Sequence, residues 1–374
     1  MTNSLTENIL LYGFFSIFLV LFFWSLIGYR ETLFKQTTLD DYSVLYSTSQ
    51  YVLGDQKLLE ISDSDLYSYA AYIYLQGQDP TTVNFEHPPL AKYLYGFGAQ
   101  LFGSVYTINS VVYGVLALCM YAFSAMVLQR TSMRFLSMAI FFSFPIVSEQ
   151  LQFTMLDIPL LISVLLLFIL LASKKCSPVM KYGLVGVCLG VMSAIKYPFP
   201  FMILPAGLVM VVAHKEKVLL HALYSFVVAV GVYLATYSVY FMSHSLVDFA
   251  RFEWFRFSWW TGERTIPKFL IFDSILFGKY AAWWQPHTIY TEPSWSRAVP
   301  LTFLGYCYAC LRQRHSFWSM MMGVFSVLTL FLFAFGSASS LRYILLLLPF
   351  WIVLIVRLLE QKLSGDTIVQ KVSP

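Results

Sequence analysis

The chain has 374 residues, of which 58% are apolar and only 12% charged. Soluble domains carry about a quarter charged residues, and disordered chains combine low hydrophobicity with high charge, so the composition excludes both classes. The net charge of +4 comes without a basic tract, which argues against nucleic-acid binding. The composition therefore predicts an integral membrane protein.

Apolar runs of the length needed to span a membrane, about 20 residues, recur along the chain. The first, 9–28, is too long for the apolar core of a signal peptide and lacks a small-residue cleavage site, so we expect an uncleaved anchor. The other predicted spans are 104–128, 135–148, 157–173, 182–196, 199–213, 218–242, 298–311, 317–336 and 343–359. We expect an all-α polytopic membrane protein with about ten transmembrane helices.

Basic residues in the short linkers orient these spans, because Lys and Arg gather on the cytoplasmic side of a membrane. The linkers that fall on one side contain Arg130, Arg134, Lys174, Lys175, Lys181, Lys215, Lys217, Arg312 and Arg314. Two long hydrophilic segments, 29–103 and 243–297, then lie together on the extracytoplasmic face. We expect a single membrane-embedded domain over 1–374, without a separate soluble domain. The lack of an Asn-x-Ser/Thr sequon fits a prokaryotic plasma membrane.

Amphipathic helices are predicted in the first long segment, over 41–53, 66–76 and 88–102. Apolar residues in each fall on one stripe at helical spacing. The third begins with Pro88-Pro89, a residue type suited to the first helical turn. We expect these helices to lie on the membrane surface.

Tryptophan is concentrated in the second long segment. It contains Trp254, Trp259, Trp260, Trp283, Trp284 and Trp295, out of nine in the chain. An interfacial aromatic belt explains most of them. One or two could instead stack beneath a sugar ring.

Acidic residues mark two candidate catalytic positions. Asp40-Asp41 follows the first span, where Thr38 and Asp41 could cap a helix or the acids could serve as a general base or a cation ligand. Asp157 opens the fourth span. It could be a helix N-cap, but an ionisable group at membrane depth is also a candidate for function.

Two cations lie at the outer interface, away from the cytoplasmic basic residues. Lys196 ends the fifth predicted span and Arg342 opens the last one, and both suit a lipid phosphate, although a snorkelling lysine is an alternative. Glu86-His87-Pro88-Pro89 is the most distinctive string. Glu86 with His87 or with His287 could hold a divalent metal, although scattered ligands are a weak signal.

These strings, in their order, resemble the GT-C glycosyltransferases that use polyprenyl-phosphate sugars. The nearest groups are the protein O-mannosyltransferases and the bacterial aminoarabinose transferases of lipid A. The matching strings are Asp40-Asp41, where the family has Asp-Glu, 85–93 with its HPPL core, Leu156-Asp157, 195–197 and 342–349. We expect the chain to depart from both groups, because its later long segment, 243–297, is too short for the lectin-like insert of the first, and the given sequence ends soon after the last predicted span, where the second group has a C-terminal soluble domain.

The resemblance implies a reaction and roles for the residues. A sugar would pass from a polyprenyl-phosphate donor to a hydroxyl of a glycan, lipid or protein acceptor, with inversion at the anomeric carbon. Asp40 is the candidate base, and Asp157 would orient the acceptor or share the proton. Lys196 and Arg342, with Lys92 as a third cation, would meet the charge on the leaving phosphate.

Two other functions fit the same composition. A lipid or solute transporter or flippase would explain the hydrophobicity, but it predicts repeated sets of spans, which the sequence does not show. A glycan ligase or polymerase with a lipid-linked donor would share the architecture.

Overall fold

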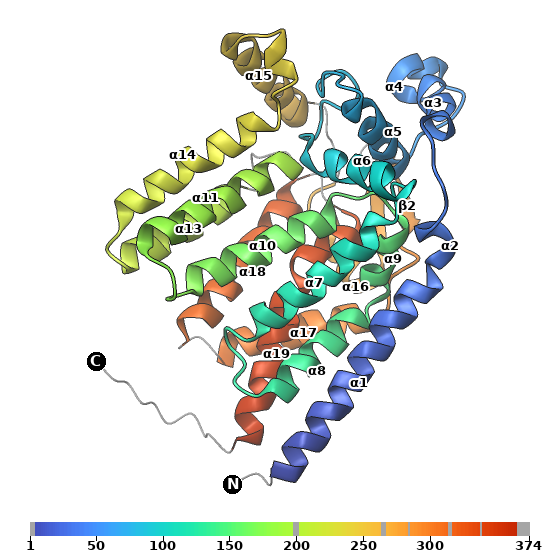
Figure 1. Ribbon diagram of the computed structural model, residues 1–374. Coiled ribbons are helices and arrows are strands. Elements are labelled where there is room, and N and C mark those ends of the chain that lie inside the picture. Colours follow the sequence, from blue (N-terminus) through green and yellow to red (C-terminus); the bar gives the residue numbers. More distant parts are fainter. Residues whose placement is uncertain are drawn as a thin grey trace. The chain divides into compact units, whose positions relative to one another are not determined.

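A computed structural model describes residues 4–196, 202–262, 267–282, 285–312, 316–336 and 339–364. These residues are mostly helical (Figure 1), and the strands among them form one antiparallel hairpin, β1 (Lys279–Ala282) with β2 (Gln285–Thr291). The chain divides into two compact units. The first unit comprises Met1–Trp24, Ala117–Ser148 and Ile266–Pro374, and the second comprises Ser25–Leu116 and Glu149–Thr265.

The second unit contains the first long segment and a layer of apolar helices. The helices of the long segment are α2 (Arg30–Leu33), α3 (Leu39–Ser47), α4 (Gln50–Leu53), α5 (Asp63–Leu75) and α6 (Leu90–Phe102). The apolar helices are α10 (Asp157–Ala172), α11 (Pro178–Ile195), α13 (Ile203–Lys215) and α14 (Leu219–Ala235), and α15 (Leu246–Gly262) follows them. Within this layer α11 packs against α10 and α14, and α13 packs against α14.

Glycines allow α11 and α14 to approach closely. A Cβ atom at Gly186 would lie 2.5 Å from the Ser225 carbonyl oxygen, and one at Gly190 would lie 2.7 Å from that of Ala229. Small residues one turn apart let membrane helices pack backbone to backbone. This contact fixes α11, whose last turn leads into Lys196.

The first unit holds most of α1 (Ser4–Gly28), the C-terminal part of α7 (Ile108–Ser124) and the C-terminal helices. The others are α8 (Thr131–Phe142), α9 (Pro145–Glu149), α16 (Leu270–Phe277), α17 (Ala298–Arg312), α18 (Phe317–Phe335) and α19 (Leu348–Leu363), with the 3-10 helix η4 (Leu341–Leu346) before α19. α19 packs against α8, α17 and α18. The chain bends by 69° at the break before Pro145, as expected where a proline cannot continue a helix.

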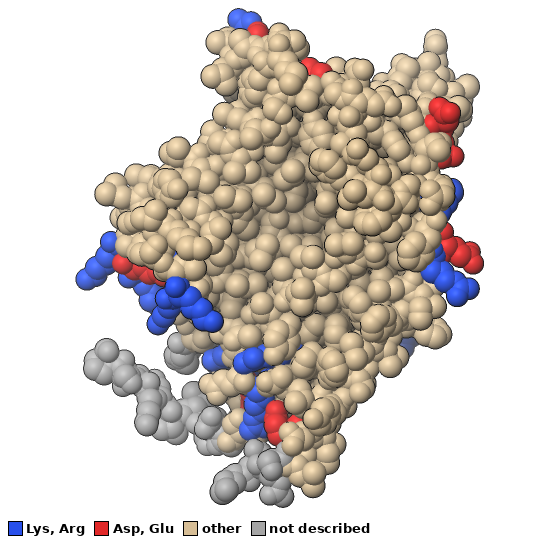
Figure 2. Space-filling model, viewed as in Figure 1, with Lys and Arg blue, Asp and Glu red and all other residues tan. Residues whose placement is uncertain are grey.

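Each of the predicted spans contains a helix, and the fold is that of an all-α polytopic membrane protein. Within the described residues, three helices are long and apolar enough to cross a membrane: α1, α11 and α18. The bent pair α8 and α9 would make a fourth, and α7, α10, α13 and α14 are shorter apolar helices. On the face shown in Figure 2, the middle of the surface carries almost no Lys, Arg, Asp or Glu, and the charged side chains lie mainly along its margins and lower end.

The two long segments contain more structure than the sequence predicted. Helices form at all three expected places in 29–103, but α5 is enclosed between α3 and α6 and is buried over most of its surface. The second long segment contains α15, α16 and the β-hairpin, none of which was predicted.

Candidate functional site

The adjacent carboxylates of Asp40 and Asp41 differ in their hydrogen bonding. Asp41 Oδ2 accepts hydrogen bonds from Thr38 N at 2.6 Å and Thr38 Oγ1 at 3.0 Å, at the start of α3. These hydrogen bonds lower the pKa of Asp41. Asp40 is exposed, and its carboxylate makes no hydrogen bond or ion pair to the described residues. The predicted helix cap is therefore present and uses Asp41, which leaves Asp40 as the candidate base.

Asp157 and Lys196 form a buried ion pair. Lys196 Nζ lies 2.7 Å from Asp157 Oδ1, and the two side chains are 5% and 3% exposed. Asp157 is the first residue of α10, and Lys196 follows the last residue of α11. Because α10 and α11 pack as neighbours joined by a short turn, the start of one meets the end of the other. The sequence placed both residues at one interface but did not predict their pairing.

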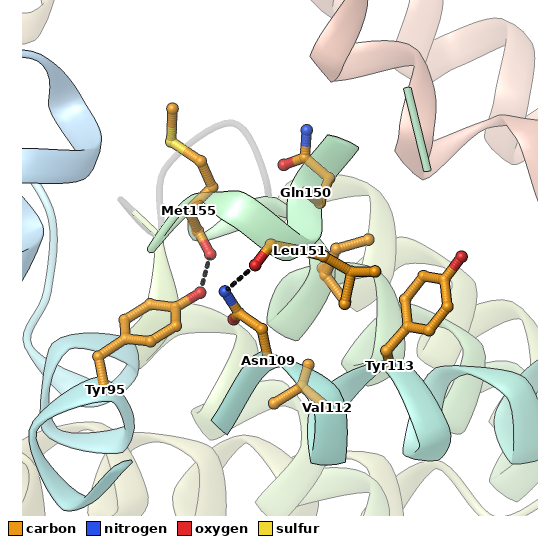
Figure 3. A pocket seen from close by; sticks show the side chains of 8 residues that line it. Tyr95, Asn109, Val112, Tyr113, Gln150, Leu151 and Met155 are labelled. Carbon is orange, nitrogen blue, oxygen red and sulfur yellow. Dashed lines mark hydrogen bonds between the residues drawn. The ribbon is translucent and has the colours of Figure 1, made fainter. Parts of the chain in front are cut away.

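A small pocket lies beside the segment that leads into Asp157. It is lined by Tyr95, Asn109, Val112, Tyr113, Gln150, Leu151, Met155 and Ile158 (Figure 3). Asn109 Nδ2 donates to the carbonyl oxygens of Leu151 at 3.1 Å and Phe153 at 2.9 Å, and Tyr95 donates its hydroxyl to the Met155 carbonyl. These contacts from α6 and α7 hold the turn that precedes Asp157.

Lys92 lies inside the protein on α6 and is fully buried. Its Nζ donates to the carbonyl oxygens of His87 at 2.6 Å and Asn84 at 3.2 Å, and it lies 5.5 Å from the centre of the Tyr67 ring. This placement argues against the predicted phosphate contact, because Lys92 Nζ is hydrogen-bonded to the backbone of the Glu86-His87 string. Through these hydrogen bonds, Lys92 instead links the segment that contains Glu86 and His87 to α6.

Burial gives Lys92 an effect on stability that depends on pH. Desolvation lowers its pKa well below the ordinary 10.5, and the charge of Arg256 also lowers it, while Glu86 opposes them. At pH values between the lowered pKa of the folded protein and the ordinary pKa of lysine, Lys92 is protonated in the unfolded chain but not in the folded protein. The free energy of unfolding therefore rises with pH in that window. As the pH rises towards the ordinary lysine pKa, we expect the Tm in detergent to increase more steeply for the wild type than for Lys92→Met. Parallel profiles would show that Lys92 does not titrate in this way.

Pro88 and Pro89 lead into α6, and the residues before them pack against α15. Glu86 and His87 are 7% and 8% exposed. Trp260 Nε1 donates to the Glu86 carbonyl at 3.1 Å, and the Trp260 and His87 rings are 5.3 Å apart.

The tryptophans of the second long segment have different environments. Trp259 packs on the Phe85 ring at 5.3 Å, and Trp295 donates to the Ile275 carbonyl at 3.0 Å. Trp254 is 70% exposed and fits the interfacial belt. Trp283 and Trp284 lie outside the described residues.

A buried polar cluster that the sequence analysis did not identify fixes α15 to the end of α14. Arg256 is fully buried and donates to Tyr237 Oη at 2.8 Å, to Glu253 Oε1 at 2.6 Å and to the Tyr233 hydroxyl. Tyr233 donates in turn to Glu253 Oε1 at 2.8 Å. The spacing of these residues is the sequence signal that could have revealed the cluster: Tyr233 and Tyr237 are four apart across the end of α14, and Glu253 and Arg256 are three apart on α15.

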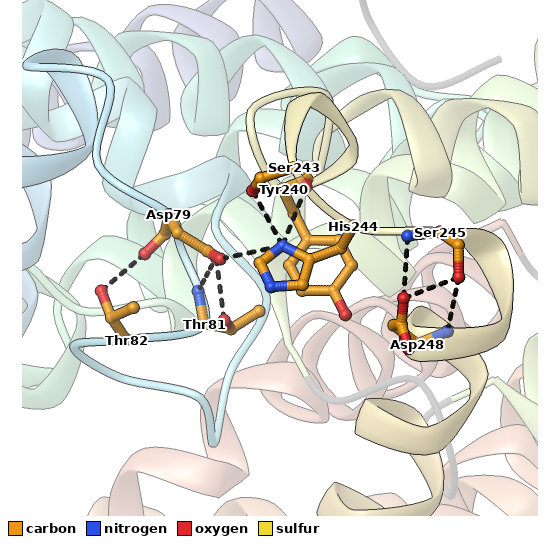
Figure 4. Close-up of polar contacts among 8 residues, drawn as sticks. All are labelled: Asp79, Thr81, Thr82, Tyr240, Ser243, His244, Ser245 and Asp248. Carbon is orange, nitrogen blue, oxygen red and sulfur yellow. Dashed lines mark hydrogen bonds and ion pairs between the residues drawn. The ribbon is translucent and has the colours of Figure 1, made fainter.

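The turn between α14 and α15 also contacts the first long segment (Figure 4). His244 Nδ1 lies 3.8 Å from Asp79 Oδ2, and the imidazole stacks on the Tyr240 ring at 4.3 Å. Asp79 Oδ1 accepts from the backbone N–H and the hydroxyl of Thr81, both at 2.8 Å. The two ends of α15 therefore both contact the first long segment, through His244 just before its start and through Trp260 near its end.

Arg342 and His287 belong to the first unit. Arg342 lies in η4, with its guanidinium 5.5 Å from the centre of the Tyr343 ring. Glu292 Oε2 fixes the start of this helix by accepting from Ser340 Oγ at 3.1 Å and Leu341 N at 3.2 Å. His287 is exposed on β2. Among the described residues, no group of three or more His, Cys, Asp or Glu side chains could hold a metal ion, so Glu86, His87 and His287 gain no support as a metal site.

The arrangement of these helices is a GT-C fold. Over 88% of its length the chain matches the crystal structure of ArnT from Cupriavidus metallidurans bound to undecaprenyl phosphate, with a TM-score of 0.59 and 15% sequence identity. The apo structure of ArnT matches over the same 88% with a TM-score of 0.57 and 15% identity. The chain spans 60% and 59% of the two ArnT chains. The sequence matches no protein-family model and no curated protein sequence.

Proposed function

We propose that the protein transfers a sugar from a polyprenyl-phosphate donor to a hydroxyl acceptor. The observation that carries this proposal is the fold, which is shared over 88% of the chain with a structure that contains undecaprenyl phosphate. The basic linkers favour an active site on the extracytoplasmic face, in a prokaryotic plasma membrane. The acceptor would be a glycan, a lipid or a protein.

The leaving group of such a reaction is a phosphate whose negative charge grows in the transition state. Fixed cations stabilise that charge best, because they need no reorganisation when it develops. Lys196 is held in place by Asp157 at 2.7 Å, and the start of η4, which carries Arg342, is fixed by Glu292. We assign the phosphate contacts to Lys196 and Arg342, and to Lys92 only the support of the Glu86-His87 string.

The acceptor hydroxyl must lose a proton as it attacks the anomeric carbon. Asp40 suits this role, because its carboxylate is exposed and is not used in capping α3. Asp41 sets the start of α3 and so places Asp40, while Asp157 acts through Lys196. Direct displacement of the phosphate inverts the anomeric carbon.

An assay of the purified protein in detergent tests this proposal. It uses a panel of polyprenyl-phosphate monosaccharides with crude envelope lipids and glycans as acceptors. We expect release of free polyprenyl phosphate and an acceptor heavier by one sugar residue. Transport needs a sealed bilayer, so turnover in detergent excludes a transporter or flippase. Transfer of a block of sugars would indicate a ligase or polymerase, and no turnover with any donor would contradict the proposal.

A further inference from the structure

The segment 84–87 is fixed by side chains from other elements. It lies between α5 and α6 and forms neither helix nor strand. The carbonyl oxygens of Asn84 and His87 accept from Lys92 Nζ, and that of Glu86 accepts from Trp260 Nε1. Among these donors, Trp260 alone comes from outside the first long segment.

The side chains of this segment are fixed as well. Tyr51 donates its hydroxyl to Glu86 Oε1 at 3.2 Å. The His87 ring lies 5.3 Å from the Trp260 ring and 6.1 Å from the Tyr67 ring, to which it is edge-on. Both Glu86 and His87 are more than nine-tenths buried, so their orientations follow the backbone that Trp260 holds.

We propose that Trp260 is a positioning residue for the segment 84–87, and that sugar transfer depends on the position it gives to Glu86 and His87. This inference rests on the proposed function. The indole does two things at once, since its N–H fixes the Glu86 carbonyl and its ring packs on His87. α15 is itself fixed by the buried Arg256 cluster and by the contact of His244 with Asp79, so Trp260 is a rigid support.

A segment without regular structure shifts when one of its carbonyls loses its partner. A misplacement of about 1 Å away from the reacting atoms can cost on the order of a hundredfold in rate. Trp260→Phe keeps an aromatic ring at this position, although a smaller one, and removes the N–H donor. Trp254→Phe is the matched control, because Trp254 lies on the same helix, is 70% exposed and packs on Phe257 of that helix.

The test measures kcat and KM for a polyprenyl-phosphate monosaccharide in detergent, together with Tm. We expect Trp260→Phe to lower kcat/KM on the order of ten- to hundredfold at a Tm close to that of the wild type. Trp254→Phe should behave as the wild type in both measurements. Unchanged kinetics in Trp260→Phe, or a loss that only follows a loss of folded protein, would overturn the inference.

Hydrogen exchange separates this inference from the proposed function, because it needs no turnover. Peptides that cover 82–92 should exchange faster in Trp260→Phe than in the wild type and Trp254→Phe, while peptides from α10 and α11 stay unchanged. If the wild type transfers no sugar, the proposed function fails and exchange alone decides the positioning role. Equal exchange in all three proteins would overturn it.

Discussion

Asp40→Asn is expected to abolish sugar transfer while the protein folds and inserts as before. The asparagine amide cannot accept the proton of the acceptor hydroxyl, and a positioned general base contributes about 10²- to 10⁴-fold in rate. The side chain is exposed and is bound to none of the described residues, so its replacement breaks no contact of the fold. The assay is transfer in detergent at equal amounts of folded protein. Activity within a few fold of the wild type would refute the assignment of Asp40.

The neighbouring acid provides a matched control for that variant. Asp41→Asn removes the same charge one residue away, from a carboxylate that accepts from Thr38 N and Oγ1. The cost to stability should stay below about 1 kcal/mol, because water screens an exposed carboxylate. The pKa of Asp41 is lowered in the folded protein, so the stability that it adds is present near neutral pH and is lost as the pH falls through the lowered value. Loss of transfer in Asp41→Asn but not in Asp40→Asn would show that Asp41, and not Asp40, is the base.

Breaking the Asp157–Lys196 pair should have the largest effect on stability. Asp157→Asn leaves the ammonium of Lys196 buried without its carboxylate, which typically costs 3–5 kcal/mol, about the size of a large single-residue effect. We expect a strong fall in Tm and in the yield of folded protein in detergent. A variant as stable as the wild type would show that the pair is not shielded from water.

Removing both charges separates stability from catalysis. Asp157→Leu with Lys196→Met replaces the pair with apolar side chains, a change that is often neutral for a buried pair. The double variant should recover most of the lost stability and still fail to use the donor, because no cation remains at this point to meet the phosphate. Donor use at the wild-type rate would exclude Lys196 from phosphate binding.

The apolar runs predicted the helices well, because a span must be apolar whatever its partners. The basic linkers oriented the spans that became α10 and α11, and this orientation placed Asp157 and Lys196 together at the outer membrane interface. Their ion pair joins residues 39 apart and depends on the packing of the two helices, which hydrophobicity does not encode.

Lys92 shows a signal that was present in the sequence but was not used. It looks like a surface cation on an amphipathic helix, yet Gly96 follows one turn later on the same face of α6. A Cβ at Gly96 would lie 2.6 Å from the Ala71 carbonyl, so this face packs closely on α5 and encloses Lys92. The buried Arg256 cluster was not predicted for a related reason: an Arg in a tryptophan-rich segment is expected to lie at the membrane interface rather than inside the protein.

A structure of Asp40→Asn with a polyprenyl-phosphate sugar bound tests the central claim most directly. The variant should bind the donor without consuming it. We predict that the phosphate lies within hydrogen-bond distance of Lys196 and Arg342 and that the anomeric carbon faces residue 40. A donor phosphate bound away from both cations, or an anomeric carbon remote from residue 40, would contradict the account.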